Sequence, residues 1–404
     1  MPQIKLIRIT TVPLSLDKLL EGQLQYMQQH IEVVAVSSGG EELEAVEKRE
    51  GVRTIAISMT RQITPLKDII SVWKLYHLFK KERPAIVHTH TPKAGIVGMT
   101  AAWLAKVPIR LHTVAGLPLM EAKGLKRKLL NFVEKTTYRF ATKVYPNSKG
   151  LYNFIKSENF TSPKKLKIIG NGSSNGINTN YFNPSLFPEE EKTALREKLN
   201  IPANAFVFVF VGRLVGDKGI NELVRAFKSL SLGKDHEIAS SPPSDAPRKD
   251  EPKIYLLLVG PEEADLDPLK PETQKEIAQN ANIITVGYQN DVRPYFAISD
   301  ALVFPSYREG FPNVVLQAAA MGLPAIVSDI NGCNEIIIPN ESGIIIPPKN
   351  TEALTDAMNL LVNDAHLYQH LKSNARAQIT SRFERQQVWD ALLEEYQTLL
   401  GEKE

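Results

Sequence analysis

Two segments of the sequence combine charged side chains with glycine turns that follow apolar runs. In the first, VFVFVGRLVGDKG (207–219), Arg213 and Lys218 come after a strand pattern and before a helix pattern. Two fixed cations beside a helix N-terminus suit a diphosphate, because both stabilise negative charge. The glycine order differs from the G-x-x-x-x-G-K-[ST] phosphate loop. The segment therefore predicts an anion site, and the alternative is a solvated loop whose cations only serve solubility.

The second segment, FPSYREGFPNVVLQAAAMG (304–322), joins a strand pattern to a helix pattern through the turn E-G-F-P (309–312). We expect Asn313 to cap this helix and Gly322 to end it. The turn would then aim backbone N–H groups and the Glu309 carboxylate at one place. A carboxylate beside an anion site is stable if it binds hydroxyls or a cation, and sugar hydroxyls suit it. The alternative is a carboxylate that only favours the helix N-terminus.

Three histidines, His88, His90 and His112, lie on or just after apolar strand patterns in the first half. His88 and His90 share one face of a strand. A metal site would need further ligands, and neither a cysteine nor a convincing third ligand accompanies this pair. We therefore expect no metal, and leave open buried, hydrogen-bonded histidines or a hydrogen-bonding role in a crevice.

Positive charge is concentrated in residues 123–167, where twelve cations face two glutamates. Within it, GLKRKLLNFVEKTTYRF (124–140) mixes cations with apolar side chains, as helices on anionic membranes do. The cations that we expect to contact a membrane or a lipid-linked acceptor are Lys123, Lys126, Arg127 and Lys128. An ordinary surface helix is the alternative. Nucleic acid is disfavoured, because the net charge is only +3 and no base-reading motif is present.

The elements that must position these residues are short, continuous apolar runs separated by helix-length segments. Such runs are typical of strands buried on both faces. They span 5–12, 31–38, 53–59, 85–90, 109–115, 143–148, 165–170, 205–212, 253–260, 282–287, 301–306, 324–329 and 343–347. The alternation predicts two doubly wound, mostly parallel α/β domains, which bind ligands beyond the carboxyl ends of their strands.

The chain of 404 residues is long enough for two domains. Clustered Pro, Asn and acidic residues predict a boundary that gives a first domain of 1–184 and a second of 185–380. A polar stretch, 233–252, predicts a mobile surface insertion in the second domain. A single cysteine excludes a disulfide framework. No run reads as a signal or a membrane span, so we expect a cytoplasmic protein.

Nearly the whole chain resembles the retaining GT-B glycosyltransferases of the group 1, family 4 type, especially bacterial capsule and O-antigen enzymes. The resemblance rests on GR…DKG, on PSYREGFPNVVLQAAAMGLPAIVSDINGCNEII and, in the first half, on HTHTPKAGIVGMTAAWLAKVPIRLHTVAGLP. It implies an α/β GT-B fold, with two doubly wound Rossmann-like domains facing each other across a cleft. The C-terminal helix, 381–404, would cross back onto the first domain.

The resemblance also implies site roles. Arg213 and Lys218 would neutralise the diphosphate leaving group, Glu309 would hold hydroxyls of the donor sugar, and His112 would face the transferred sugar from the first domain. The remaining donor-binding positions would be Gly212, Gly310, Phe311, Pro312, Asn313, Val314 and Gln317. The family pattern is E-x7-E, and Gln317 stands where the second glutamate binds ribose. An amide both donates and accepts hydrogen bonds there, so donor affinity or nucleotide choice should differ.

The activity implied is transfer, with retention, of a hexose or N-acetylhexosamine from a UDP-sugar to a polyprenyl diphosphate-linked saccharide in bacterial surface polysaccharide synthesis. The protein would be peripheral on the inner face of the cytoplasmic membrane. It would need neither cofactor nor metal, since the two cations replace one. The alternatives are a non-catalytic scaffold and an epimerase- or phosphorylase-type relative that binds sugar nucleotides. A dehydrogenase is disfavoured, because GNGSSNG (170–176) departs from the G-x-G-x-x-G fingerprint.

Overall fold

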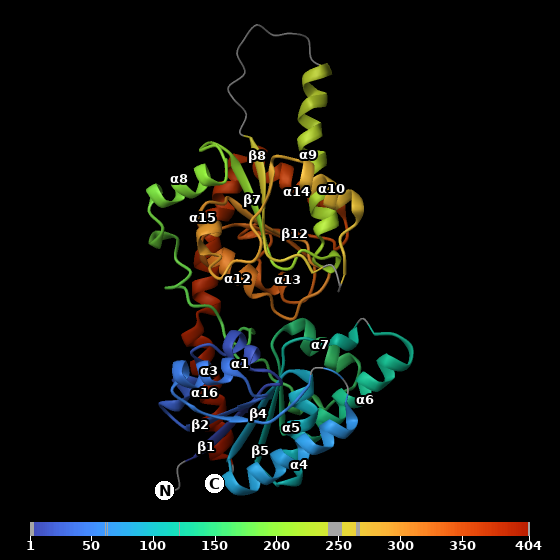
Figure 1. Ribbon diagram of the computed structural model, residues 1–404, viewed down its shortest axis with the longest axis vertical. Coiled ribbons are helices and arrows are strands. Elements are labelled where there is room, and N and C mark those ends of the chain that lie inside the picture. Colours follow the sequence, from blue (N-terminus) through green and yellow to red (C-terminus); the bar gives the residue numbers. More distant parts are fainter. Residues whose placement is uncertain are drawn as a thin grey trace. The chain divides into compact units, whose positions relative to one another are not determined.

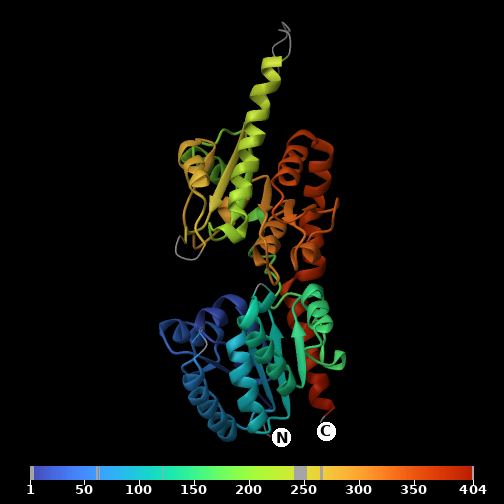
Figure 2. The ribbon, with the colours of Figure 1, turned by 90° about the vertical axis from the view of Figure 1, so that its right-hand side faces the viewer.

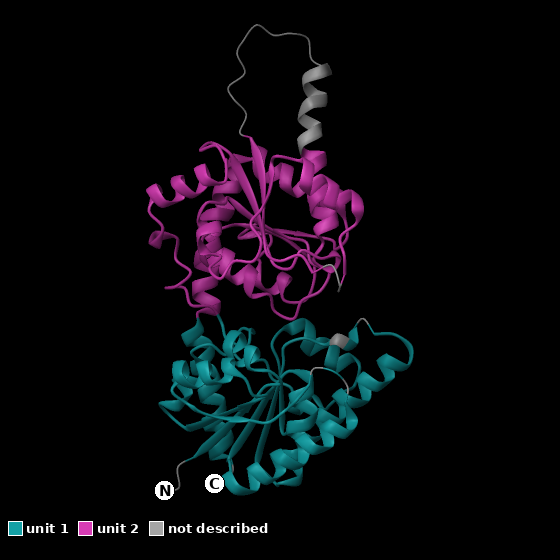
Figure 3. Cartoon of the chain, viewed as in Figure 1, with its two compact units in different colours: residues 1–176, 385–404 teal, residues 177–384 magenta. Residues whose placement is uncertain are grey.

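The chain forms two compact units (Figure 3). Each has its own buried apolar clusters. The computed structural model describes residues 4–60, 62, 64–120, 122–240, 253–263 and 267–402. Unit 1 comprises 1–176 and 385–404, and unit 2 comprises 177–384. The predicted boundaries at 184 and 380 therefore move to 176 and 384. The physical reason is that residue 177 already belongs to unit 2, since its N–H donates to the Phe383 carbonyl at 2.8 Å.

Unit 1 is built on a six-stranded parallel sheet with the order β3-β2-β1-β4-β5-β6 (Figure 1). The strands are β1 (Lys5–Ile9), β2 (Glu32–Ser37), β3 (Arg53–Ala56), β4 (Ile86–His90), β5 (Ile109–Val114) and β6 (Lys143–Pro146). In the register, Ile7 of β1 pairs with Val34 on one side and Val87 on the other.

The strand predicted over 165–170 is wrong. Only Leu166 pairs there, in an isolated bridge to Val144. The residues before it form a 3₁₀ turn, Pro163–Lys165. The Lys165 ammonium donates to carbonyl oxygens at the end of the preceding long helix, including that of Ala141 at 2.7 Å. After Leu166 the chain makes no further strand pairing before the turn at residue 170.

Helices cover both faces of the unit 1 sheet (Figures 1 and 2). On one face are α4 (Pro65–Glu82), α5 (Pro92–Leu104), α6 (Gly124–Phe140) and α7 (Lys149–Ser157). On the other are α1 (Pro13–Leu19), α2 (Gln23–Gln28), α3 (Glu41–Glu50) and the C-terminal α16 (Arg385–Gly401). Each layer buries its own apolar cluster, with Leu75 and Tyr138 in the first and Leu24 and Leu392 in the second.

Unit 2 repeats this topology with the order β12-β11-β10-β7-β8-β9. The strands are β7 (Phe206–Val211), β8 (Ile254–Val259), β9 (Ile283–Thr285), β10 (Ala301–Phe304), β11 (Ala325–Ser328) and β12 (Gly343–Ile346). All are parallel and fall within the predicted runs. If the strands of each unit are counted along the chain, both sheets have the spatial order 3-2-1-4-5-6. The predicted doubly wound architecture is confirmed.

The helices of unit 2 are α8 (Glu189–Lys198), α9 (Ile220–Ser240), α10 (Pro271–Gln279), α11 (Arg293–Ala297), α12 (Asn313–Ala320), α13 (Cys333–Ile336), α14 (Thr351–Asn363) and α15 (Ala365–Phe383). Helix α9 runs into the predicted surface insertion, so 233–240 continue a helix. Residues 241–252 of that insertion lie outside the described residues. Over the described ranges, no helix has both the length and the apolar character needed to cross a membrane.

The shared topology fixes where ligands can bind. The first and fourth strands of each unit are neighbours, and the chain leaves them in opposite directions. The crevice beyond their carboxyl ends is the switch point at which open α/β sheets bind ligands. In unit 2 these strands are β7 and β10, which pair through Leu302 and Val209. The two charged segments follow β7 and β10, so the fold brings them together.

Candidate functional site

The loops after β7 and β10 touch each other at the switch point of unit 2. The Tyr307 N–H donates to the Asp217 carbonyl at 2.9 Å. Gly219 has a φ of 74°, and a Cβ there would lie 2.2 Å from the Pro305 carbonyl oxygen. Only glycine permits this approach, because any side chain would push the two loops apart. The glycine turn thereby places Lys218 beside the second segment.

Lys218 and Glu309 form an ion pair between Nζ and Oε1. The Ser306 hydroxyl donates to the same carboxylate oxygen at 3.0 Å. Both charged side chains are 17% exposed, so the pair is partly shielded but reachable. The Lys218 ammonium also lies 5.9 Å from the centre of the Phe304 ring. This arrangement can offer one cation to a phosphate oxygen and one carboxylate to a sugar hydroxyl.

Arg213 pairs with a carboxylate that sequence reasoning missed. Its Nη1 lies 3.0 Å from Oε2 of Glu263, which follows β8. The two loops are held together by the backbone, since the Leu214 N–H donates to the Pro261 carbonyl at 2.8 Å. The signal was present as an acidic pair, Glu262 and Glu263, at the end of a buried strand pattern. The sequence could not show that Glu263 pairs with Arg213, because this contact depends on the pairing of β7 with β8.

The E-G-F-P turn leads into α12, which begins at Asn313 as predicted. Pro312 occupies the cap position, so the predicted capping role of Asn313 is wrong. Gly322 takes a φ of 83° beyond the helix end, which confirms that part of the prediction. The turn is held in place by Asn331, whose Nδ2 donates to the Gly310 carbonyl at 2.6 Å. This side chain is a further component that sequence reasoning missed.

The predicted donor-binding positions therefore share one region of unit 2. Phe311 and Pro312 are buried; Gly212, Gly310, Val314 and Gln317 are half-buried, and Asn313 is exposed. Gln317 lies one helical turn after Asn313 and thus faces the same side of α12. A ligand that contacts the start of this helix could reach the Gln317 amide.

His112 belongs to unit 1, whereas the other three predicted catalytic residues belong to unit 2. Its side chain is 2% exposed. Its Nδ1 lies 2.8 Å from the Thr89 hydroxyl, and a Cβ added to Gly95 would lie 2.5 Å from its ring. Burial lowers the pKa of His112 to about 4, so the imidazole is neutral near pH 7. Of the four predicted catalytic side chains, Lys218 and Glu309 are in direct contact, and Arg213 lies on the same loop as Lys218.

His88 and His90 point to the opposite face of the unit 1 sheet, toward α16. They surround Arg8, whose Nη2 lies 2.6 Å from His90 Nε2 and whose Nη1 bonds the Tyr396 hydroxyl. Burial and the Arg8 charge hold the pKa of both histidines well below its usual value. The interpretation as buried, hydrogen-bonded histidines is confirmed. Within the described residues, no three His, Cys, Asp or Glu side chains are grouped to hold a metal.

The basic helix α6 departs from prediction at one cation. Lys123, Lys126 and Lys128 are exposed. Arg127 is instead engaged, because its Nη1 donates to the Leu119 carbonyl at 2.6 Å and its Nη2 lies 3.2 Å from the Glu158 carboxylate. Arg127 therefore fastens α6 to its surroundings and is not a free cation.

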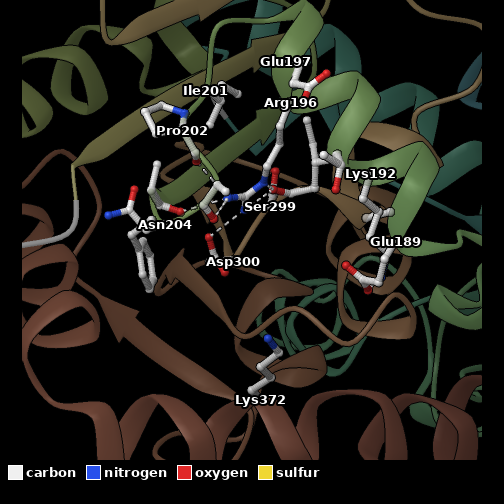
Figure 4. Close-up of a pocket in the computed structure, with 16 residues that line it drawn as sticks. Glu189, Lys192, Arg196, Glu197, Ile201, Pro202, Asn204, Ser299, Asp300 and Lys372 are labelled. Atoms are coloured by element: carbon white, nitrogen blue, oxygen red, sulfur yellow. Dashed lines mark hydrogen bonds and ion pairs between the residues drawn. The ribbon is translucent and has the colours of Figure 1, made fainter.

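A cavity of about 700 Å³ in unit 2 lies away from these residues, beside α8 (Figure 4). Its lining includes Arg196, Asp300 and Lys372, and the start of β7. Arg196 donates to the Ile298 carbonyl at 2.7 Å and to three other carbonyl oxygens, so its charge holds the surrounding loops together. None of the predicted site residues lines this cavity.

Two units that share one doubly wound topology are characteristic of the GT-B fold. The crystal structure of Anabaena Alr3699/HepE in complex with UDP superposes with a TM-score of 0.77, at 18% identity, and covers 98% of this chain and 100% of that one. This likeness confirms the fold.

Sequence comparisons identify the family. The glycosyl transferases group 1 model matches residues 191–378, and the glycosyl transferase 4-like domain model matches 21–172. A Staphylococcus aureus relative, the capsular polysaccharide biosynthesis glycosyltransferase CapM, is 31% identical over 99% of this chain and 98% of its own length. An Escherichia coli relative, a UDP-Gal:alpha-D-GlcNAc-diphosphoundecaprenol alpha-1,3-galactosyltransferase, is 32% identical over 81% of this chain and 78% of its own. The chain belongs to the group 1 glycosyltransferases.

Proposed function

We propose that this glycosyltransferase moves a hexose or N-acetylhexosamine from a UDP-sugar to a polyprenyl diphosphate-linked saccharide in bacterial surface polysaccharide synthesis. The observation that carries the proposal is the Lys218–Glu309 pair, with Arg213 on the same loop, at the switch point of unit 2. The donor and acceptor classes are those in the name of the Escherichia coli relative. The capsular relative supports the place in polysaccharide synthesis.

In this proposal the cations of unit 2 stabilise the leaving group. As the bond between the anomeric carbon and the diphosphate breaks, negative charge grows on the diphosphate oxygens. Arg213 and Lys218 are already at the site and face that charge, so little reorganisation is needed. Arg213 gives up Glu263, which costs little because both side chains are more than a third exposed. Glu309 then accepts hydrogen bonds from donor-sugar hydroxyls.

Retention follows if the acceptor attacks from the face that the diphosphate leaves. The acceptor hydroxyl forms the new bond to the anomeric carbon, and its proton passes to the departing phosphate oxygen. Glu309 is held by Lys218 and Ser306, which suits a binding role better than attack on carbon. His112, neutral because of its low pKa, can contribute a hydrogen bond but no charge. The two cations supply what a metal would otherwise supply, so the reaction should need none.

The acceptor side is assigned to unit 1. The exposed ammonium groups of Lys123, Lys126 and Lys128 can attract anionic headgroups or the acceptor diphosphate. The protein would then be peripheral on the inner face of the cytoplasmic membrane. A second candidate, a non-catalytic or epimerase-type relative, is motivated by Gln317, which replaces a glutamate of the family pattern.

The test is to incubate the protein with single UDP-sugars and an undecaprenyl diphosphate-linked saccharide, with and without EDTA. We expect one UDP-sugar to be consumed only when acceptor is present, at a rate that EDTA leaves unchanged. NMR of the product should show the anomeric configuration of the donor. Consumption without acceptor would indicate an epimerase, inversion would contradict same-face attack, and no consumption would indicate a non-catalytic protein.

A further inference from the structure

The outward side of α4 in unit 1 carries a row of large apolar side chains that face solvent. They are Leu66, Ile69, Ile70 and Trp73, which are 80%, 66%, 54% and 62% exposed. Their spacing places them on one side of the helix. The inward side of α4 has its own apolar residues, with Leu75 and Phe79 buried against the sheet. A helix that is apolar on both sides needs a second apolar environment. We call the outward row the apolar ridge.

A second apolar group lies on α6. Leu125, Leu129 and Phe132 are exposed and again share one side of their helix. Helix α5 packs against both α4 and α6, so the three helices form one layer over the sheet (Figures 1 and 2). Both groups occupy the first half of their helices. Since each helix follows a parallel strand, both lie toward the carboxyl edge of the sheet, where ligands bind.

The exposed charged side chains of α4 and α6 are cations. On α4, the cations Lys67, Lys74, Lys80 and Lys81 are exposed. The Asp68 carboxylate pairs with Lys93 at 2.6 Å, and Glu82 pairs with Lys5 at 2.6 Å. On α6, Glu134 is buried. In these three helices, as far as the structure describes them, every carboxylate is paired or buried, while lysines remain exposed beside the apolar side chains.

Unit 2 offers no comparable surface in its described residues. Its exposed large apolar side chains are Tyr181, Leu186, Tyr288 and Leu360, which lie in four different elements or loops. Scattered residues of this kind are normal on a soluble surface. The combination of aligned apolar side chains with an excess of exposed cations is therefore specific to unit 1. Apolar side chains flanked by lysines are complementary to the boundary between anionic headgroups and acyl chains.

We propose that the apolar ridge inserts into the outer acyl region of an anionic bilayer, together with the exposed apolar side chains of α6. Unit 1 is thus held at the membrane by insertion and not by charge alone. The inference rests on the proposed function in one respect: a lipid-linked acceptor would present its reacting saccharide at the membrane surface. The sequence predicted membrane contact for the basic helix α6 only. The structure adds α4, which carries more exposed apolar side chains.

Trp73 allows a direct test, because quenching by brominated acyl chains reports contact with the membrane interior. The protein is mixed with vesicles of phosphatidylcholine and phosphatidylglycerol that carry brominated chains, without donor or acceptor. We expect clear quenching in the wild type and in Trp103→Phe, and its loss in Trp73→Phe. Trp103 is the matched control, because it is exposed on the same layer but at the far end of α5. Trp389, on α16, is buried within unit 1, so the brominated chains should not quench its fluorescence.

Sedimentation with the same vesicles, unbrominated, separates insertion from charge. In high salt, Ile69→Ser/Ile70→Ser should bind at least about tenfold more weakly than wild type, because screening removes the electrostatic part. Leu360→Ser in unit 2 should bind like wild type. Equal quenching in Trp73→Phe, or complete release of the wild type by salt, would overturn the proposal. The proposal would also be overturned if the wild type were a dimer and the ridge substitutions made it a monomer. The apolar ridge would then be a contact between two copies of the chain.

The outcome can be separated from that of the proposed function. Sugar transfer is assayed in parallel with a short-chain, water-soluble diphosphate-linked acceptor. The ridge variants should transfer sugar to it at the wild-type rate. A protein that inserts but transfers no sugar would contradict the proposed function alone, and one that transfers sugar without inserting would contradict only this inference.

Discussion

In unit 2 the first and fourth strands end beside an ammonium–carboxylate pair, whereas in unit 1 the equivalent strands end beside two hydroxyls. Lys218 pairs with Glu309 in the first case. In the second, the Thr11 and Thr91 hydroxyls lie 2.7 Å apart. The strand order is the same. The fold thus supplies a place for a ligand, and the residues placed there decide whether that ligand is charged.

The contrast extends to the buried groups. The histidines beneath the unit 1 strand ends have pKa values lowered by burial, and burial raises the pKa of the Glu134 carboxyl to about 7. Burial thus favours the neutral forms of these three histidines and of Glu134. The other buried charged side chains of unit 1 include Arg8, and Glu50 and Glu395, which form ion pairs with Arg49 and Lys167. In unit 2 the cations at the strand ends are ion-paired and partly exposed, so that a ligand can take the place of the paired carboxylate. The strand ends of unit 2 thus present an ion pair, whereas the equivalent strand ends of unit 1 present hydroxyls.

The largest effect should come from removing a cation of unit 2. Lys218→Ala or Arg213→Ala should lower turnover by about 10²–10³-fold while leaving the fold intact, because each loses stabilisation of the leaving diphosphate. Lys228→Ala is the control, since that lysine is also ion-paired in unit 2 but lies on α9. Initial rates with the preferred UDP-sugar measure the effect. Near-normal rates in both site variants would remove the diphosphate assignment.

A second prediction tests the neutrality of unit 1. The Glu134 carboxyl has a folded pKa of about 7 against an ordinary 4.5, so above pH 7 the buried charge destabilises the fold. As pH falls below 7 the folded carboxyl is protonated, and the cost decreases steadily until the pH reaches the ordinary pKa of 4.5. Glu134→Gln should therefore gain stability relative to wild type by about 2 kcal/mol more at pH 8 than at pH 5.

Urea unfolding at the two pH values measures this difference. The exposed Glu44→Gln is the control and should show no such trend. A constant offset between Glu134→Gln and wild type at both pH values would mean that Glu134 titrates normally, and the contrast between the units would lose this support.

A third prediction concerns the ion pairs of unit 2 as replaceable partners. Glu263→Gln should bind UDP up to about fivefold more tightly, because the diphosphate no longer competes with a carboxylate for Arg213. Glu262→Gln removes the same charge one residue away and should change binding less. Calorimetric titration compares the two. Equal effects would indicate that only the overall electrostatic potential matters. Weaker UDP binding by Glu263→Gln would show that Glu263 positions Arg213.

The smallest expected effect is at Gln317. If its side chain contacts the ribose, Gln317→Glu should preserve UDP binding or tighten it by at most about threefold, since a carboxylate accepts hydrogen bonds from both ribose hydroxyls. Binding of inorganic pyrophosphate, which has no ribose, should not change. A folded variant with the same affinity for every nucleotide and for pyrophosphate would place Gln317 outside the site.

Much of unit 2 could be predicted because each motif is a continuous segment that carries its own strand, turn and helix signals. Arg213, Lys218 and Glu309 were assigned together on that basis; in the structure Lys218 pairs with Glu309, and Arg213, on the same loop as Lys218, pairs with Glu263. Glu263 was missed because its contact with Arg213 depends on strand pairing across 50 residues of sequence. Arg8 was missed for the same reason, since Gln23, His90 and Tyr396 meet it from distant parts of the chain.

The apolar ridge shows a different limit of sequence reasoning. The pattern DIISVWKLYHLFKKE (68–82) predicted a helix, and α4 confirms it. Apolar residues occur on both of its sides, so periodicity could not tell which side the sheet would cover. The wrong strand over 165–170 has a similar origin, because an apolar run can be buried without pairing along its length.

The central claim is that unit 2 binds a nucleoside diphosphate sugar through paired cations without a metal. Thermal unfolding with UDP, GDP, ADP, NAD and a panel of UDP-sugars, in EDTA, tests it most directly, because a ligand stabilises the folded state by RT ln(1 + [L]/Kd). We predict a clear rise in Tm with UDP and with one UDP-sugar, and its loss in Lys218→Ala. No shift with any nucleotide, or a shift with NAD alone, would contradict the account.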